Sequence, residues 1–153
     1  MAKQRDAIRM SEQEILDFLE TRRSMIVSTL LKDGSPHLTT LWFAVKDGTY
    51  LFETYGTSQK VVNLRRDPRI ALMWEDGVTY DQLRGVTVNG TAEIIDSEPR
   101  LSELMAYIVK RNSPGLGDHL AEHVANMVRK RVVVAVTPDK TISWDHRKIA
   151  AKA

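Results

Sequence analysis

Residues 25–54, MIVSTLLKDGSPHLTTLWFAVKDGTYLFET, decide the fold class of this chain. Three runs rich in Val, Ile, Leu and Thr, at 25–31, 37–45 and 49–54, are separated by polar segments that contain Asp33-Gly34 and Asp47-Gly48. An Asp-Gly pair between extended runs is a strong hairpin signal, because Gly tolerates the positive φ angle that tight turns require. The stretch therefore predicts three consecutive antiparallel strands that form a meander.

Helices and further strands are expected on both sides of this stretch. The clearest strand is residues 86–94, where apolar and polar side chains alternate. The clearest helix is residues 97–111, where apolar side chains recur at intervals of three and four. In full, we predict helices at 11–22, about 58–66, 97–111 and from 118 onward, and strands at 25–31, 37–45, 49–54, 69–75, 86–94, 132–136 and 141–145.

The predicted elements form one domain over residues 1–153. The chain is 42% apolar and 27% charged, which is enough apolar material for one core, and no repeat or linker divides it. Antiparallel strands with separate helices predict a small barrel of the α+β class with inserted helices. We expect flexible ends at about 1–8 and 148–153, where the composition is polar, basic or alanine-rich.

Composition excludes several classes of function. The 22 basic and 20 acidic residues give a formal charge of +2, which is too balanced for a protein that wraps nucleic acid or coats a membrane surface. The absence of cysteine excludes a disulfide scaffold, a thiol nucleophile and an iron–sulfur cluster. Without an apolar run that resembles a signal peptide or a membrane helix, we expect a cytoplasmic protein with neither nucleic-acid nor membrane partners.

One motif suggests a metal, but we predict no metal site. His119-Leu-Ala-Glu122-His123 fits the inverted zincin pattern, in which two His on one helix face hold zinc. That geometry needs a later carboxylate ligand, and only Asp139 and Asp145 follow. We therefore expect a solvent-exposed helix face at this position.

The segment around Lys60 has features of a phosphate cradle. After the strand that ends near Thr54, Gly56 permits a tight turn, and a short helix begins with Lys60 in its first turn. The positive end of a helix dipole disfavours Lys there unless an anion neutralises both charges. The hydroxyls of Thr57 and Ser58, the backbone N–H groups of 58–60 and the Lys60 ammonium would bind that anion. The alternative is a simple cap beside a Lys that faces solvent.

At this segment the chain resembles a known family. The carrying motifs are residues 27–38, VSTLLKDGSPHL, residues 60–69, KVVNLRRDPR, and residues 90–94, GTAEI. Over about residues 11–146 they resemble the pyridoxamine-phosphate-oxidase-like split-barrel superfamily, and more closely its B group of flavin- and deazaflavin-dependent oxidoreductases. The resemblance implies a mostly antiparallel split β-barrel that forms a homodimer with a cofactor groove at the interface.

The resemblance also implies a cofactor and the residues that contact it. B-group members use the deazaflavin coenzyme F-420, whereas the oxidases use FMN and carry an Arg where this chain has Gln59. Lys60 is the anchor for the cofactor phosphate, and Arg65, Arg66 and Arg69 would attract the acidic tail of F-420. The full implied set of cofactor contacts is His37, Thr39, Thr40, Leu41, Trp42, Thr54, Tyr55, Thr57, Ser58, Gln59, Lys60 and Asn63.

The expected function is therefore an F-420-dependent reductase that transfers a hydride from the reduced cofactor to an unsaturated small molecule such as an enone, a quinone or a tetrapyrrole. Two alternatives stay open: an FMN-dependent oxidoreductase of the same fold, and a non-enzymatic protein that binds a flavin, a deazaflavin or heme. No catalytic acid or base is singled out by its spacing. Solvent, Tyr55 or Tyr80 would supply the proton that follows the hydride.

Overall fold

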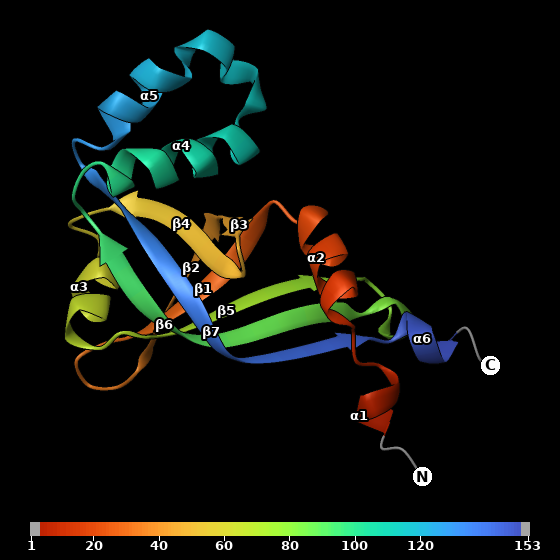
Figure 1. Cartoon of the computed structure of the whole chain (residues 1–153). Helices are drawn as coiled ribbons and strands as arrows, with labels where there is room; N and C mark the ends of the chain where they lie inside the picture. The colour runs from red at the N-terminus through yellow and green to blue at the C-terminus, as the bar shows by residue number, and fades with distance from the viewer. Residues whose placement is uncertain (1–3, 151–153) are drawn as a thin grey trace.

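The computed structural model describes residues 4–150 as one curved antiparallel sheet with helices at its ends and on its outer side (Figure 1). The helices are α1 (Gln4–Ala7), α2 (Glu12–Glu20), α3 (Gln59–Arg66), α4 (Arg100–Asn112), α5 (Leu120–Met127) and α6 (Arg147–Ala150), with 3-10 turns η1 (Tyr80–Gln82) and η2 (Pro114–His119). The strands are β1 (Ser24–Leu30), β2 (Pro36–Trp42), β3 (Ala44–Lys46), β4 (Thr49–Tyr55), β5 (Arg69–Asp76), β6 (Arg84–Ile95) and β7 (Arg131–Asp145).

The strand order is β2-β1-β5-β6-β7-β4-β3, and every pair is antiparallel. The predicted meander is therefore wrong. The two Asp-Gly hairpins exist, as β1–β2 and β3–β4, but they lie at opposite edges of the sheet. Because β2 also contacts β4, the sheet curls until its two edges approach each other. This confirms the α+β class and a mostly antiparallel barrel that stays open between β2 and β4.

Phe43 breaks the single strand that was predicted at 37–45. Its side chain is fully buried and packs edge-on against Trp74, with ring centroids 5.1 Å apart. Its carbonyl accepts hydrogen bonds from the side chains of Arg111 and Asn112 instead of from a neighbouring strand. The chain thus leaves the β1 edge at Trp42 and joins the β4 edge at Ala44.

The last two predicted strands are in fact one long strand, β7. Pro138 was expected to end the first of them, but it lies opposite Gly90, where the β6–β7 register shifts. A bulge tolerates proline because the register shift leaves one residue outside the hydrogen-bond ladder. β7 therefore continues past Pro138, and it pairs with β6 from Val133 to Asp145 and with β4 from Arg131 to Val136.

Two apolar clusters stabilise the fold on opposite faces of the sheet. The larger lies inside the curve and includes Val27, Phe52, Trp74 and Val88. The second lies where α4 covers β4 and β7 on the outer side and α5 packs on α4 (Figure 1), and it includes Met105 and Val133. Each strand therefore contributes alternate residues to different surroundings, as its period of two requires.

The helix boundaries follow their capping chemistry. The capping box of α2 is complete, since the Ser11 hydroxyl accepts from the Glu14 N–H and the Glu14 carboxylate accepts from the Ser11 N–H. The predicted 97–111 helix begins later, at Arg100, with Pro99 at its N-cap. The 3-10 turn η2 precedes α5, so the helix expected from Asp118 begins at Leu120.

The predicted flexible ends fall partly outside the described residues. Within the described part, the Asp145 N–H donates to the Ile8 carbonyl at 2.7 Å, and Lys148 on α6 donates to the Arg9 carbonyl and to Glu14. Residues 1–3 and 151–153 lie outside the description. Among residues 4–150, no helix is both long and apolar enough to cross a membrane.

Candidate functional site

The loop between β4 and α3 forms one corner of the opening between the sheet edges. β4 ends at Tyr55, whose carbonyl accepts a hydrogen bond from the Ser58 N–H at 3.0 Å. The Gly56 N–H donates to the carbonyl of Lys130, the residue before β7. Ser58 stands at the N-cap of α3, but its hydroxyl makes no capping bond and instead accepts a hydrogen bond from Thr54 Oγ1 at 3.4 Å. The Ser58 hydroxyl proton and the N–H groups of Gln59 and Lys60 have no partner among residues 4–150 and could donate to a ligand.

Lys60 differs from expectation, because its side chain is buried rather than exposed to solvent. Only 9% of the residue is accessible, and Nζ donates to Thr54 Oγ1 at 3.1 Å. The residue lies on the same face of α3 as Val61 and Leu64, which packs against the sheet. Burial lowers the pKa of Lys60, while the negative charge of Glu53 raises it.

The Lys60 ammonium is not matched by a negative partner. Among residues 4–150, no carboxylate lies within ion-pairing distance of Nζ, and Thr54 is its single recorded hydrogen-bond partner. An ammonium carries three N–H donors, so two are unused. A buried cation with spare donors fits a bound anion such as a phosphate.

β2 presents two further unsatisfied polar atoms. His37, Thr39 and Leu41 are register partners of Thr29, Val27 and Met25, so they share the inner face of the sheet. His37 Nδ1 and Thr39 Oγ1 are buried, and neither has a hydrogen-bond partner within residues 4–150. Buried polar atoms are normally paired, and these two point to a missing ligand or water. Thr40 and Trp42 alternate with them and face the outer side.

Asn63 joins α3 to β1 and brings the two walls together. It is fully buried, and its Nδ2 donates to Thr29 Oγ1 at 3.0 Å, while its Oδ1 accepts from Gln59 at 2.8 Å. Thr29 is also the register partner of His37. The inner face of β2 and the helix that carries Lys60 therefore meet at Thr29. The Asn63–Thr29 bond holds α3 against β1, and the Gln59–Asn63 bond within α3 orients the Asn63 amide.

His37 and Thr39 from β2, Thr54 from β4, and Ser58 and Lys60 from α3 are therefore the candidate cofactor site. The family resemblance implies a cofactor groove at these residues, and we call them the β2–α3 groove. Thr57 is exposed beside Ser58.

A second group of predicted residues lies at the outer rim. Tyr55 is half-exposed, and the Arg131 guanidinium stacks 4.1 Å from its ring centroid. Trp42 is also half-exposed, with Arg23 stacked at 4.5 Å. Arg131 pairs with Glu53 at 2.7 Å, and both are partly buried. Glu53, Arg23 and Arg131 were missed from the sequence, because nothing local joins residues 78 positions apart.

Other residues considered from the sequence lie elsewhere or are already engaged. Tyr80, one suggested proton donor, stacks on His146 beside α6, at the far end of the sheet from α3 (Figure 1). Arg65 pairs with Asp96 at 3.1 Å, and Arg66 donates to the Leu30 carbonyl. Hydrogen bonds from the guanidinium and the backbone N–H of Arg69 to Asp67 lower the pKa of that carboxyl to about 2. Attraction of an acidic cofactor tail by these arginines stays a prediction.

The zincin-like motif forms no ligand cluster. His119, Glu122 and His123 are exposed on η2 and α5. Nowhere in the described range do three His, Asp or Glu side chains gather closely enough to hold a metal.

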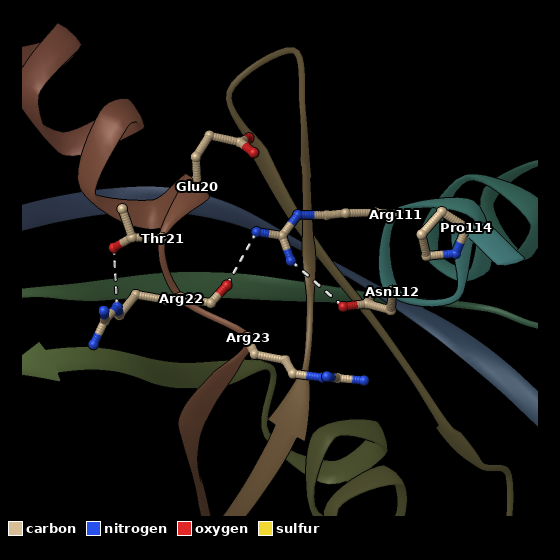
Figure 2. Close-up of a pocket in the computed structure, with 7 residues that line it drawn as sticks. All are labelled: Glu20, Thr21, Arg22, Arg23, Arg111, Asn112 and Pro114. Atoms are coloured by element: carbon tan, nitrogen blue, oxygen red, sulfur yellow. Dashed lines mark hydrogen bonds between the residues drawn. The ribbon is translucent and has the colours of Figure 1, made fainter.

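A polar cavity of about 410 Å³ lies between α2 and the end of α4 (Figure 2). Arg111 dominates it and makes structural contacts. Its guanidinium donates to the carbonyls of Leu19, Arg22 and Phe43, and it lies 4.4 Å from the Phe43 ring centroid. Arg111 therefore joins α4 to the end of α2 and to the segment between β2 and β3. We interpret the cavity as a structural contact between these elements and not as a ligand site.

Comparison with known proteins identifies the family. The model of the pyridoxamine 5'-phosphate oxidase family matches residues 11–145. A Mycobacterium tuberculosis biliverdin reductase that depends on reduced coenzyme F-420 is 32% identical over 107 residues, which are 67% of this chain and 77% of that protein.

Solved structures agree with this match. A conserved hypothetical protein from Mycobacterium tuberculosis is 45% identical, with a TM-score of 0.89 over 97% of this chain and 93% of that one. A structure described as an F-420 reductase shares the fold at 22% identity, with a TM-score of 0.61 over 82% of this chain and 93% of that one. A heme storage protein from Vibrio cholerae shares it at 15% identity, with a TM-score of 0.65 over 86% and 94%. The family match, the relative and the open barrel together establish that this chain belongs to the pyridoxamine 5'-phosphate oxidase-like split-barrel superfamily.

Proposed function

We propose that the protein is an oxidoreductase that uses coenzyme F-420 and reduces an unsaturated small molecule. One observation carries this proposal: Lys60 is a buried cation with unused N–H donors and no carboxylate partner within residues 4–150. Such a group suits the cofactor phosphate, and the spare His37 and Thr39 atoms line the same groove. The relative of 32% identity, described as a reductase that uses this cofactor, supports the choice.

Each wall of the β2–α3 groove has a separate task in this proposal. Lys60, the Ser58 hydroxyl and the first N–H groups of α3 bind the phosphate. The side chains of His37 and Thr39 form hydrogen bonds with the deazaflavin ring system. Leu41 lies beside them and excludes water. When bound in reduced form, the deazaflavin supplies a hydride to the acceptor. Tyr55 is the remaining protein candidate for the proton, because Tyr80 lies at the other end of the molecule.

FMN is the second candidate cofactor. It would bind the same cradle, but Gln59 replaces the arginine that the oxidases place next to the lysine, and the Gln59 amide is bonded to Asn63. One phosphate-binding charge is therefore absent, which favours F-420. A non-enzymatic heme or flavin carrier would use the spare His37 nitrogen.

The proposal includes a homodimer and a cytoplasmic location. Ile26 and Leu38 expose apolar side chains on the outer face of β1 and β2, with 37% and 64% of each residue accessible. Ile26 lies opposite Met73 of β5, so the apolar strip crosses three strands. A second copy of the chain would cover this strip.

Titration of the purified protein with F-420 and FMN side by side tests the proposal. Lys60→Met removes the charge but keeps a buried apolar stem of similar volume. We expect it to weaken F-420 binding by about 1.5–3 kcal/mol, the value of a hydrogen bond to a charged group. Folding should be unaffected or improved, because the variant removes a buried charge.

Lys32→Met is the matched control, since Lys32 is exposed in the β1–β2 turn. It should bind F-420 like the wild type. Equal F-420 affinity of Lys60→Met and wild type would refute the cradle. Tighter binding of FMN or heme than of F-420 would refute the choice of cofactor.

A further inference from the structure

A second cavity lies on the outer side of β4, beneath the hairpin of α4 and α5. Its volume is about 240 Å³. One wall is apolar and one rim is polar, and the lining residues are Trp42, Glu53, Ile108, Val109, Asn112, Ser113, His123, Met127 and Arg131. We call it the α4–α5 pocket. We infer that it binds a flat one- or two-ring carboxylate, and that this is the acceptor class of the enzyme.

The position of the pocket connects it with the β2–α3 groove. Glu53 and Thr54 are adjacent on β4 and face opposite sides of the strand. Thr54 binds Lys60 in the groove, and Glu53 lines the pocket. Trp42 lines the pocket too, and Tyr55 stacks on Arg131 at its rim. The end of β4 therefore separates the two spaces.

The apolar wall selects a flat ring system. Ile108 and Val109 are nearly completely buried on α4, and Met127 of α5 and the Trp42 indole complete the wall. Aromatic side chains bind planar ligands by stacking, and methionine adapts to an irregular shape. Drug-sized ligands usually occupy pockets of roughly 300–1,000 Å³. This smaller pocket suits one or two fused rings, and it would hold only part of a tetrapyrrole.

The polar rim selects an anionic oxygen. Arg131 uses one N–H to bind Glu53. A guanidinium has five N–H donors in total, so Arg131 can still bind a ligand oxygen. His123 and Ser113 add further donors, whereas the Asn112 amide nitrogen already binds the carbonyls of Phe43 and Ile108. Arg23 does not line the pocket but stacks on the ring of Trp42, which does, so the lining and this arginine together hold two guanidinium groups and one carboxylate, Glu53. The excess positive charge favours a carboxylate over a neutral ligand.

The assignment of the pocket as the acceptor site rests on the proposed function, but its ability to bind a carboxylate does not. Calorimetric titration of the cofactor-free protein with 2-naphthoate and with the neutral 2-naphthamide tests the pocket directly. The variants are Arg131→Gln, which removes the charge, and Met127→Trp, which fills the space. Arg129→Gln is the control, since Arg129 is exposed nearby and does not line the pocket.

We expect the wild type and Arg129→Gln to bind naphthoate more tightly than naphthamide. Arg131→Gln should weaken naphthoate binding about tenfold or more and leave naphthamide unchanged, because the lost contact is a hydrogen bond between charged groups. Met127→Trp should weaken both ligands. Circular dichroism confirms that each variant is folded.

Two results overturn the inference: naphthoate does not bind, or it binds all four proteins equally. F-420 titration of the same samples separates this result from the proposed function. Naphthoate binding that depends on Arg131 in a protein that does not bind F-420 supports the pocket and refutes the cofactor. F-420 binding without naphthoate binding supports the cofactor and refutes the pocket.

Discussion

Burial of the Lys60 ammonium costs free energy when the groove holds no ligand, and a bound anion would offset that cost. Burial lowers the pKa of Lys60, because the charged form loses water, and the opposing effect of the Glu53 charge only partly compensates. A phosphate in the groove would supply a negative charge at close range and raise the pKa again. Binding of an anion and protonation of Lys60 are therefore coupled.

This coupling predicts how F-420 affinity depends on pH. Below the lowered pKa, Lys60 is already protonated and affinity is highest. As the pH rises through that pKa, binding must take up a proton, so affinity should fall by up to about tenfold per pH unit. Titrations from about pH 7 to about pH 10 cover the range below the ordinary lysine pKa.

Lys60→Arg is the control for this pH effect. A guanidinium stays charged throughout the range, so the variant should bind with an affinity that does not change with pH. If wild type and Lys60→Arg lose affinity in parallel, a group other than Lys60 is responsible.

The sequence singles out Lys60 as a candidate anion-binding residue, but it does not predict that the side chain is buried. A Lys in the first turn of a helix indicates an anion site, because its charge opposes the helix dipole. Whether the side chain faces solvent depends on how α3 docks, and the Asn63–Thr29 hydrogen bond joins residues 34 positions apart. No local pattern encodes that contact. The Glu53–Arg131 pair could not be predicted either, because its residues are also far apart in the sequence.

At the scale of elements, Arg111 joins α4 to two segments that are distant in sequence. Its guanidinium donates to the Arg22 carbonyl just after α2 (Figure 2), to the Leu19 carbonyl in the last turn of α2 and to the Phe43 carbonyl between β2 and β3. Arg111→Met removes one charged donor from each of these carbonyls, of which Leu19 keeps the Arg22 N–H and Phe43 keeps the Asn112 amide. We expect a loss of about 2–3 kcal/mol in the free energy of unfolding, measured in urea.

Lys110→Met is the matched control, because Lys110 is the exposed neighbour on the same helix. It should change stability by less than about 0.5 kcal/mol. Equal stabilities of the two variants would show that the Arg111 contacts contribute nothing measurable.

The β6–β7 bulge requires glycine at position 90. A Cβ atom there would lie 2.5 Å from the Thr137 carbonyl oxygen and 2.7 Å from Val136 Cγ1. Because the oxygen belongs to backbone, it cannot move aside without disturbing the ladder. Gly90→Ala should destabilise the protein by about 1–3 kcal/mol, the usual cost of overpacking.

Gly115→Ala provides the comparison, since a Cβ at Gly115 would meet nothing within 4 Å. Thermal unfolding of both variants measures the difference. A Gly90→Ala protein as stable as Gly115→Ala would mean that the bulge relaxes freely.

Most elements could be predicted from local chemistry. Capping at Ser11, both Asp-Gly hairpins and the alternation along β6 are signals contained in short windows. Errors occurred where a tertiary contact overrides the local pattern. Phe43 interrupts an extended run because Trp74 and Arg111 bind it, and Pro138 fails to end β7 because a bulge accommodates it.

At the scale of the whole molecule, the strand order places both halves of the groove at the sheet edges. Only the pairing of β1 with β5 and of β4 with β7 brings β2 and α3 together, and the sequence order gives no sign of either pairing. The pattern of strands and helices predicted a small α+β barrel, and the resemblance to the family added that the barrel is split. The same topology leaves the outer face of β1 and β2 exposed and apolar.

That outer face predicts the assembly of the proposed dimer. Leu38→Asp places a charge in the middle of the strip that includes Ile26 and Met73. Burying an unpaired carboxylate is strongly unfavourable, so the variant should sediment as a monomer where the wild type sediments as a dimer. Leu16→Asp is the control, because Leu16 is similarly exposed but lies on α2.

The dimer prediction and the cofactor prediction are connected, because the family resemblance implies that the second copy of the chain completes the cofactor site. A monomeric Leu38→Asp protein keeps Lys60, Thr54 and the Asn63–Thr29 contact, since these lie within one chain on the inner side of the sheet. It loses whatever surface the second copy adds. F-420 should therefore still bind, but more weakly than to wild type and to Leu16→Asp. A monomer with wild-type affinity would show that each chain holds the cofactor alone, and a dimeric Leu38→Asp protein would place the interface elsewhere.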